Sequence, residues 1–206
     1  MRDTLVILGA SGHGKVVADI AEKMNVYNEI LLLDDNEDVK QCLGMPVEGK
    51  LDTCFSYIDK ADMFVAIGNA KIRKEKMEDL LAKGASMPVL IHPTAVLGTG
   101  VTIAEGSVVM AGAIINPDTS IGKGCIINTA SSVDHDCKIS DYVHIAVGAH
   151  VAGTVNIEEA TWIGAGATVI NNIQICSECM VGAGAVVTKN IEEQGTYVGV
   201  PAKKIK

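Results

Sequence analysis

The stretch from Ile157 to Val187 decides the fold of this chain and reads IEEATW-IGAGAT-VINNIQ-ICSECM-VGAGAV-V. An Ile or Val opens each block of six, and the same period extends back without a slip to Ile91. All of the seventeen aliphatic residues in this series except Leu97 are β-branched, which favours extended, packed backbone. A short fixed period indicates a solenoid, and a period of six predicts a β-helix of hexapeptide repeats.

A small residue stands two positions before most of these aliphatics, as Thr161 stands before Ile163. Residues two apart in a strand face the same side, so both are expected to point inward. Stacked coils would then bury one continuous aliphatic column. The glycines that follow the aliphatic residue, where a corner favours a residue without Cβ, are Gly98, Gly122, Gly164 and Gly182. A repetitive β-sandwich is the alternative, but it needs turns of varying length rather than hexads in phase.

The first 87 residues follow another rule, the strand–helix alternation of an α/β sheet. The expected strands are Thr4–Leu8, Glu29–Leu33 and Met63–Ile67, and the expected amphipathic helices are Lys15–Met24 and Lys71–Lys83. The sequence therefore predicts a Rossmann-like domain over residues 1–87, a β-helix domain over 88–187 and a C-terminal turn or hairpin tail over 188–206.

Composition narrows the class of protein. The chain has 206 residues, 48% of them hydrophobic and 3% aromatic, so the core is aliphatic. The net charge of −8 argues against a nucleic-acid surface. No apolar run reaches membrane-spanning length, and no charged segment followed by a short apolar segment gives the pattern of a signal peptide. A cytoplasmic protein without a membrane partner is therefore expected. Cys176 and Cys179 form a C-x-x-C, but this pair lies within a hexad and has no second pair, which argues against a metal or redox centre.

A glycine-rich turn, Gly9-Ala-Ser-Gly-His-Gly14, separates the first strand from the first helix. Backbone there can approach a phosphate, and a helix N-terminus favours negative charge. The spacing G-x-x-G-x-G differs from the dinucleotide pattern, and Asp34 and Asp35 follow the second strand, where they suit a ribose or base edge. These features favour one nucleotide diphosphate over NAD. The alternative is that the glycines only make a tight turn.

The tripeptide Asp134-His135-Asp136 is the second candidate site. The hexad frame points Val133 and Cys137 inward, so His135 is expected on an outward corner. A carboxylate beside an imidazole holds one tautomer and raises its basicity, as a general base requires. An exposed tripeptide of this kind is also common as a solvated turn, so spacing leaves both interpretations open.

Several stretches together carry a resemblance to a known family. They are Gly9 to Val17, Leu33 to Asp35, Ala66 to Asn69, Asn128 to Asp136, His144, Ala152-Gly153, Ile163 to Ala167 and Tyr197 to Lys203. Over nearly its whole length the chain resembles the β-helix acetyltransferases that modify nucleotide-linked amino sugars. The nearest groups are the UDP-4-amino-sugar N-acetyltransferases of bacillosamine synthesis (PglD type) and the sialic acid O-acetyltransferases (NeuD type).

This resemblance implies left-handed coils and a homotrimer with acetyl-CoA between adjacent β-helices. It places the diphosphate of a UDP-sugar near Ser11, Gly12 and His13, and the uracil near Asp34, Asp35, Ile67 and Gly68. It makes His135 the general base and Asp136 the acid that raises its basicity, a position where the family often has Glu. It assigns a substrate contact to Asn128 and acetyl-CoA contacts to His144, Gly153, Gly164 and Gly182.

The expected activity is acetyl-CoA-dependent N-acetylation of the 4-amino group of a UDP-linked amino sugar, by direct transfer. O-acetylation of sialic acid or another sugar hydroxyl is the alternative. A β-helical carbonic anhydrase would need three converging histidines, for which His135, His144 and His150 are the candidates. Such an enzyme needs neither a carboxylate-flanked histidine nor a glycine turn, so no metal is expected. A scaffold without chemistry is the remaining alternative.

Overall fold

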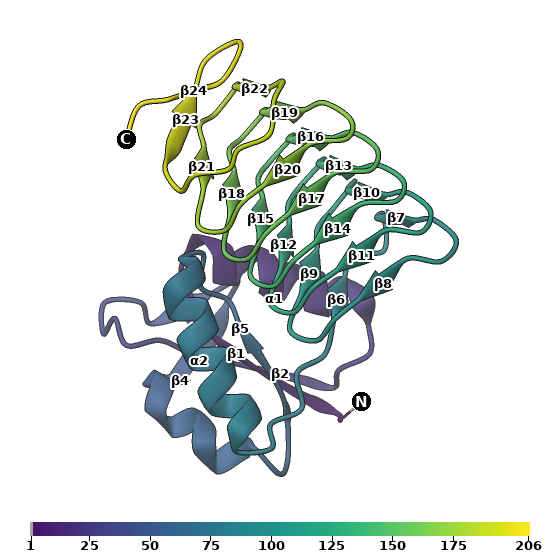
Figure 1. Ribbon diagram of the computed structural model, residues 1–206. Coiled ribbons are helices and arrows are strands. Elements are labelled where there is room, and N and C mark those ends of the chain that lie inside the picture. The colour runs from purple at the N-terminus through teal and green to yellow at the C-terminus, as the bar shows by residue number, and fades with distance from the viewer. Residues whose placement is uncertain (1) are drawn as a thin grey trace. The chain divides into compact units, whose positions relative to one another are not determined.

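The computed structural model describes residues 2–206, and the chain divides into two compact units, Met1–Pro93 and Thr94–Lys206 (Figure 1). Each unit follows the architecture that its sequence pattern predicts. The first is a Rossmann-like α/β unit, and the second is a left-handed parallel β-helix.

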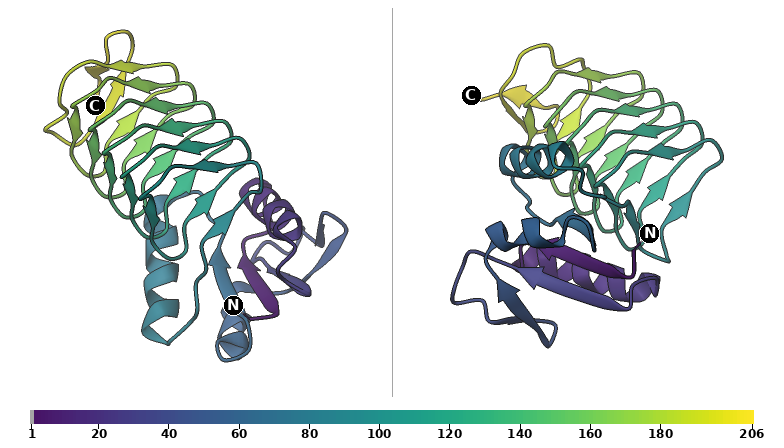
Figure 2. Two further views of the ribbon diagram at one scale, coloured as in Figure 1. Left: turned by 90° about the vertical axis from the view of Figure 1, so that its right-hand side faces the viewer. Right: turned by 90° about the horizontal axis from the view of Figure 1, so that it is seen from below.

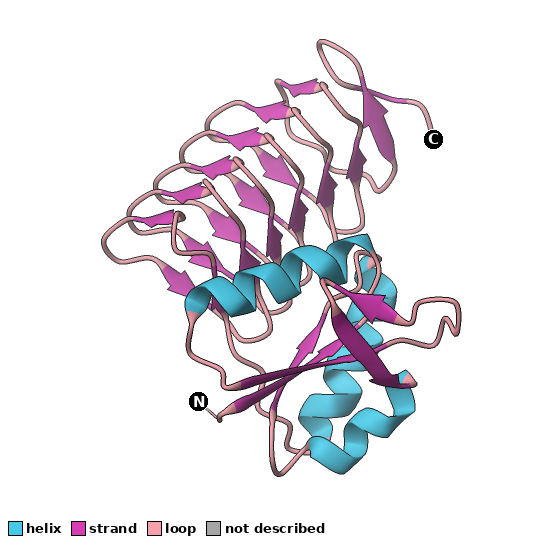
Figure 3. Ribbon diagram, turned by 180° about the vertical axis from the view of Figure 1, so that it is seen from behind, coloured by secondary structure: helices cyan, strands magenta, loops and turns pink. Residues whose placement is uncertain are grey.

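The first unit is built on a sheet with the strand order β3-β4-β2-β1-β5. Its elements are β1 (Thr4–Leu8), α1 (Gly12–Met24), β2 (Glu29–Leu33), β3 (Gln41–Cys42), β4 (Met45–Gly49), the 3₁₀ helix η1 (Leu51–Tyr57), β5 (Asp62–Val65), α2 (Ala70–Ala82) and β6 (Leu90–Ile91). Strands β4, β2, β1 and β5 run parallel, and β3 pairs antiparallel with β4. Helix α1 packs on β1 and β2, while α2 packs on β5 (Figure 3).

The predicted strands Thr4–Leu8 and Glu29–Leu33 are confirmed, but the segment between β2 and β5 was not anticipated. Strands β3 and β4 form a hairpin around Leu43 and Gly44, which both have positive φ. Pro46 interrupts the strand pattern there, so the sequence shows no alternation. Helix α1 begins at Gly12, three residues earlier than expected, because the end of the glycine-rich turn is its first turn.

The coils of the second unit contribute two-residue strands to three sheets, and Figure 2 shows these coils stacked along one axis. The first sheet contains β22 (Val186–Val187), β19 (Thr168–Val169), β16 (His150–Val151), β13 (Ser132–Val133), β10 (Ile114–Ile115) and β7 (Val96–Leu97). The second contains β20 (Gln174–Ile175), β17 (Asn156–Ile157), β14 (Lys138–Ile139), β11 (Ser120–Ile121) and β8 (Thr102–Ile103). The third has the strand order β24-β23-β21-β18-β15-β12-β9-β6, in which the strands not yet given are β24 (Lys203–Lys204), β23 (Thr196–Val198), β21 (Met180–Val181), β18 (Trp162–Ile163), β15 (His144–Ile145), β12 (Ile126–Ile127) and β9 (Val108–Val109).

Paired residues are eighteen positions apart, so three hexads make one coil. Every aliphatic residue of the repeat from Val109 to Val187 is at most 3% exposed, which confirms the inward column. The start of the series departs from this pattern: Ile91 and Ile103 are half-buried, and Leu97 is 39% exposed on β7, the edge strand of its sheet. The small residues beside the column are buried as well, and hydroxyls such as that of Thr161 donate to main-chain oxygens at the corners.

Positive φ angles mark a corner at every sixth residue from Gly100 to Gly184. Most of these positions hold Gly, Asp or Asn, the residues that tolerate left-handed backbone best. The corner glycines expected from sequence have a different reason. A Cβ on Gly164 would lie 2.5 Å from the carbonyl oxygen of Val181 in the next coil, so close stacking excludes a side chain there.

After the last coil, the tail pairs β23 with the antiparallel strand β24 (Lys203–Lys204).

Both α helices have thirteen residues. Among the described residues, 2–206, no helix has the length and apolar character that crossing a bilayer requires.

Candidate active site

His135 and Asp136 form an ion-pairing couple at the corner that follows β13. Nδ1 of His135 donates to Oδ2 of Asp136 at 2.7 Å. Asp136 has a φ of 57°, a left-handed conformation that Asp tolerates, at one of the six-residue corners. Since Nδ1 carries the proton of the neutral imidazole, Nε2 holds the free lone pair.

The corner that carries His135 and Asp136 is held by hydrogen bonds that side chains make, most of them to main-chain atoms. Oγ1 of the buried Thr119 donates to the carbonyl oxygen of Asp134 at 2.6 Å and accepts from the Cys137 amide at 3.1 Å. Oδ1 of Asp134 accepts from the His135 amide at 2.8 Å and from Nδ2 of Asn116 at 2.7 Å. Asp134 therefore fixes the backbone of His135, whereas Asp136 binds its ring.

These contacts move the pKa values in opposite directions. The hydrogen bond from Asn116 holds the pKa of Asp134 below its usual value, helped by the His135 amide. The hydrogen bond to Asp136 raises the pKa of His135 above its usual value, and the charges of both aspartates act in the same direction. The imidazole is exposed and has become a stronger base than a free histidine.

Gly153 leaves the room that the His135 ring occupies. A Cβ at position 153 would lie 2.6 Å from Nε2 of His135 and 2.7 Å from its Cε1. Gly153 follows His135 by eighteen residues, which is one coil. A side chain at position 153 would therefore displace the ring, and a glycine leaves it in place.

Asn128, His144 and Trp162 form a second cluster. Nδ2 of Asn128 donates to Nε2 of His144 at 3.0 Å. The rings of His144 and Trp162 stack with centroids 5.2 Å apart and planes 8° apart, because the two residues are partners on β15 and β18. Within one chain this cluster lies on the third sheet and its corner, whereas His135 follows a strand of the first sheet. Gly164 and Gly182 follow β18 and β21 of the third sheet.

The glycine-rich turn in the first unit contains glycines of two kinds. A Cβ on Gly14 would lie 1.9 Å from the carbonyl oxygen of Gly9, and a Cβ on Gly9 would lie 2.8 Å from that of Ala66. Packing of the strand–helix crossing therefore explains both. Gly12 is exposed, and a Cβ there would meet nothing in the described chain within 4 Å. Packing leaves Gly12 unexplained, so it remains the glycine that a ligand can approach.

Ser11 and His13 flank Gly12 at the start of α1. Ser11 is the N-cap residue, and its side chain makes no capping hydrogen bond within residues 2–206. Nε2 of His13 is buried and has no hydrogen-bond partner among those residues. Burial lowers the pKa of His13 to about 4, and the charge of Arg73 acts in the same direction. His13 is therefore neutral near pH 7 and can offer a ligand a hydrogen bond but not a positive charge.

The two aspartates after β2 have different roles. Oδ2 of Asp34 accepts from the Ala10 amide at 2.7 Å and Oδ1 accepts from the Asn36 amide at 2.8 Å, so both oxygens hold main chain. Asp35 is exposed and accepts from the Leu51 amide at 2.9 Å through Oδ1. Asp34 thus joins the glycine-rich turn to β2, and Asp35 is the aspartate that presents itself to solvent.

Arg73 was not anticipated from sequence. It is 1% exposed, and its Nη1 donates to the carbonyl oxygens of Ile67 and Gly68 at 2.9 and 2.8 Å. The buried guanidinium therefore sets the turn after β5, and Ile67 lies 3.6 Å from where a Cβ on Gly9 would be. A charged residue in a helix usually faces solvent, so no sequence signal distinguished Arg73. Trp162 was also missed, although an eighteen-residue coil length places it beside His144.

Comparison with known proteins gives matches in both units. The family model for the PglD N-terminal domain matches residues 4–80, and the model for the bacterial transferase hexapeptide (six repeats) matches residues 154–189. The UDP-N-acetylbacillosamine N-acetyltransferase of Bacillus subtilis is 36% identical over 111 residues. That match covers 52% of this chain and 51% of the relative, so the chain matches about half of the length of this curated relative.

Solved structures match along nearly the whole chain. The acetyltransferase domain of PglB from Neisseria gonorrhoeae, in complex with acetyl coenzyme A, is 40% identical with a TM-score of 0.96, and the match covers 100% of both chains. PerB from Caulobacter crescentus, in complex with CoA and GDP-perosamine, is 34% identical with a TM-score of 0.93, over 98% of this chain and 97% of that one. This chain therefore belongs to the PglD-type family of hexapeptide-repeat sugar acetyltransferases, which confirms the resemblance seen in its sequence.

Proposed function

We propose that this chain transfers an acetyl group from acetyl-CoA to the 4-amino group of a UDP-linked amino sugar, with His135 as the general base. The observation that carries the proposal is the couple of His135 and Asp136, whose hydrogen bond leaves Nε2 as the proton acceptor. The structural relatives in complex with acetyl-CoA or with CoA and a nucleotide sugar support the two substrates.

In the proposed reaction, Nε2 of His135 removes a proton from the acceptor amine as the nitrogen attacks the thioester carbonyl. Asp136 holds the ring by Nδ1 and stabilises the imidazolium that forms. A main-chain amide beside the thioester stabilises the oxyanion, and the imidazolium then protonates the departing thiolate of CoA. Because transfer is direct, positioning the two substrates supplies much of the remaining rate enhancement.

The nucleotide is assigned to the first unit. Its diphosphate lies beside Ser11, Gly12 and His13, where, within residues 2–206, an open glycine, an unused cap and a buried unpaired Nε2 coincide. The start of α1 adds main-chain amides that favour an anion. The uracil lies beside Asp34, Asp35 and the turn of Ile67 and Gly68, and Arg73 holds that turn in place.

Acetyl-CoA is assigned to the β-helix, where His144, Gly153, Gly164 and Gly182 contact it and Asn128 contacts the sugar. The assembly proposed is a homotrimer with acetyl-CoA between adjacent β-helices. His135 is exposed in a single chain, so a neighbouring copy has room to complete the site. Sedimentation of the purified chain tests this part, and a monomer at assay concentration would contradict it.

The test is a panel of acceptors incubated with acetyl-CoA and scored for release of the CoA thiol. The panel contains UDP-linked and GDP-linked 4-amino sugars, the matched UDP-sugar with a 4-hydroxyl, and free sialic acid. We expect release with the UDP-linked amine and an acetamide at C4 in the product. Release only with the GDP-linked amine would reject the nucleotide assignment, and release only with sialic acid would establish the O-acetyltransferase alternative. If no acceptor of a broad panel caused release of the CoA thiol, acyl transfer by this chain would be rejected.

A further inference from the structure

The pair Cys176 and Cys179 spans the corner between β20 and β21, and the proposed acyl transfer uses neither residue. Their Sγ atoms lie 3.4 Å apart, both as free thiols. Sequence spacing argued against a redox centre because the pair lies within a hexad. The structure adds that this particular hexad corner brings the two sulfurs into contact.

Hydrogen bonds to the preceding coil and to the tail fix the main chain of this corner. Oγ1 of the buried Thr161 accepts from the Cys179 amide at 3.2 Å and donates to the carbonyl oxygen of Cys176 at 2.9 Å. The Cys176 amide donates to the carbonyl oxygen of Ile191 at 2.9 Å. One hydroxyl thus holds both ends of the corner, so the two thiols meet without ordering a loop. A disulfide has a sulfur separation of about 2.0 Å, so the two sulfurs must come closer than their present contact for the bond to form.

The two thiols differ in access. Cys176 is half-buried and lines an open hollow of about 200 Å³ together with Gln174, Asn190 and Ile191. Cys179 is buried, and its burial, together with the hydrogen bond to Cys176, raises the pKa of its thiol to about 12. Cys176 is therefore the thiol that a soluble reagent reaches, and Cys179 is placed to react with it afterwards.

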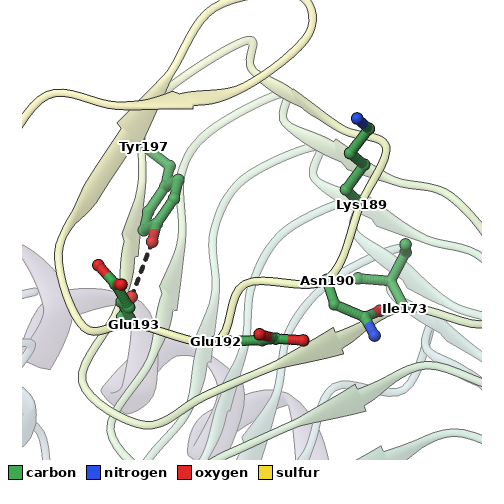
Figure 4. A pocket seen from close by; sticks show the side chains of 6 residues that line it. All are labelled: Ile173, Lys189, Asn190, Glu192, Glu193 and Tyr197. Atoms are coloured by element: carbon green, nitrogen blue, oxygen red, sulfur yellow. Dashed lines mark hydrogen bonds between the residues drawn. The ribbon is translucent and has the colours of Figure 1, made fainter.

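The dithiol also contacts the tail. The Cys179 thiol donates to the carbonyl oxygen of Glu193 at 3.6 Å, and the Tyr197 hydroxyl donates to the same oxygen at 2.8 Å. Figure 4 shows the Tyr197 hydroxyl directed at Glu193, beside a wide-open surface hollow of about 590 Å³ that Lys189 and Asn190 also line. A disulfide would remove the thiol donor and leave Tyr197 as the donor to this carbonyl.

We propose that Cys176 and Cys179 are a site of reversible thiol oxidation by small-molecule disulfides such as glutathione disulfide. The Cys176 sulfur attacks one sulfur of glutathione disulfide and breaks its sulfur–sulfur bond, which forms a mixed disulfide, and the Cys176 proton goes to the glutathione that is released. The Cys179 sulfur then attacks Cys176, and its proton goes to the second departing glutathione. Two protein thiols are oxidised and one glutathione disulfide is reduced to two glutathione molecules, so the exchange balances. An excess of glutathione reverses it.

The chain contains its own control for this reaction. Cys125 lies three coils below Cys179 at the same inward position, with Gly122 in the place of Cys176. It is buried and its Sγ donates to the carbonyl oxygen of Ser140 at 3.1 Å. Cys42, Cys54 and Cys137 are buried as well. These four thiols are expected to stay reduced under conditions that oxidise the pair.

The experiment equilibrates the folded full chain with mixtures of oxidised and reduced glutathione, alkylates free thiols under denaturing conditions and maps them by mass spectrometry. We expect a linked peptide containing Cys176 and Cys179, with the other four thiols alkylated. Cys125→Ser should leave the linkage intact, Cys176→Ser should abolish it, and Cys179→Ser should trap glutathione on Cys176.

Two results would overturn the proposal. One is that Cys176 and Cys179 are both still alkylated, and so still reduced, after incubation in mixtures that fully oxidise a reference C-x-x-C peptide. The other is oxidation of the buried control cysteines at the same ratio as the pair, which would indicate unfolding rather than a built site. Mapping of the wild-type chain tests the proposal by itself, even if the Cys179→Ser chain does not fold.

Discussion

The two units of this chain each present a histidine, and the environments of the two rings are opposite. His13, in the glycine-rich turn of the α/β unit, has a buried Nε2 without a protein partner in the described chain and a pKa lowered to about 4. His135, on a corner of the β-helix, is exposed and its pKa is raised by Asp136. Burial beside an arginine keeps an imidazole neutral, whereas a carboxylate on an exposed corner makes it a better base. The same residue type therefore suits ligand binding in one unit and proton transfer in the other.

Removing the base should have the largest effect. His135→Ala is expected to lower kcat by about 10²–10⁴-fold with little change in the unfolding midpoint, because the exposed ring contributes proton transfer rather than packing. Steady-state thiol release measures this loss. His150→Ala, which removes another exposed histidine of the solenoid, is the matched control and should keep normal turnover. A His135→Ala chain with near-normal kcat would remove His135 from the mechanism.

His13 should instead make the free energy of unfolding depend on pH. Because the pKa of His13 is about 4 when folded and about 6.5 when unfolded, the unfolded chain binds a proton first as pH falls. Stability is therefore full above about pH 6.5 and falls by up to about 3 kcal/mol on the way to about pH 4. Denaturant unfolding of the wild type and of His13→Gln at several pH values checks this. The variant should lack this part of the pH dependence, and identical slopes would show that His13 is not protected from protonation.

Removing the carboxylate that binds the ring should shift a pH profile. Asp136→Asn takes away the main cause of the raised His135 pKa, so the acidic limb of kcat/KM should move to lower pH. The weaker base should also lower kcat by about 10–10²-fold. Asp134→Asn is the matched control, because Asp134 binds the main-chain amide and should move the limb less. An unmoved limb in Asp136→Asn would mean that the limb reports another group.

The smallest effect separates ligand binding from packing in the glycine-rich turn. Gly12→Ala should weaken UDP binding by about 5–10-fold and raise the unfolding free energy by up to about 1 kcal/mol, because its Cβ meets no atom of the described residues and the unfolded chain loses freedom. Gly14→Ala should lower the unfolding free energy by about 1–3 kcal/mol, because its Cβ would overlap the Gly9 carbonyl. Calorimetric titration with UDP and denaturant unfolding measure the two quantities. Unchanged UDP affinity in Gly12→Ala would leave that glycine without a ligand role.

Prediction from sequence worked best where one short pattern repeats. The hexads predicted the inward column from Val109 to Val187, because each coil contains a complete repeat and its neighbours stack in the same way. It worked least between β2 and β5, where β4 depends on pairing with β2, β3 depends on pairing with β4, and neither shows alternation of its own. Strands defined by a distant partner leave little trace in local sequence.

The candidate site divides in the same way. His135 and Asp136 are adjacent in the chain, so their hydrogen bond could be anticipated, as could the outward corner that carries them. The stacking of His144 on Trp162, the space that Gly153 leaves for the His135 ring and the carbonyl contacts of Arg73 join residues that are not adjacent. The register of the coils and the packing of α2 decide these contacts.

The sequence by itself determined a solenoid preceded by an α/β unit, because hydrophobic period and strand–helix alternation are local properties that each segment carries alone. Only the tertiary structure decided which glycines make room for packing and which stay open, and which imidazole is neutral and which is basic. Those properties depend on burial and on charges brought in from other parts of the chain, such as Arg73 beside His13, and no local pattern encodes them.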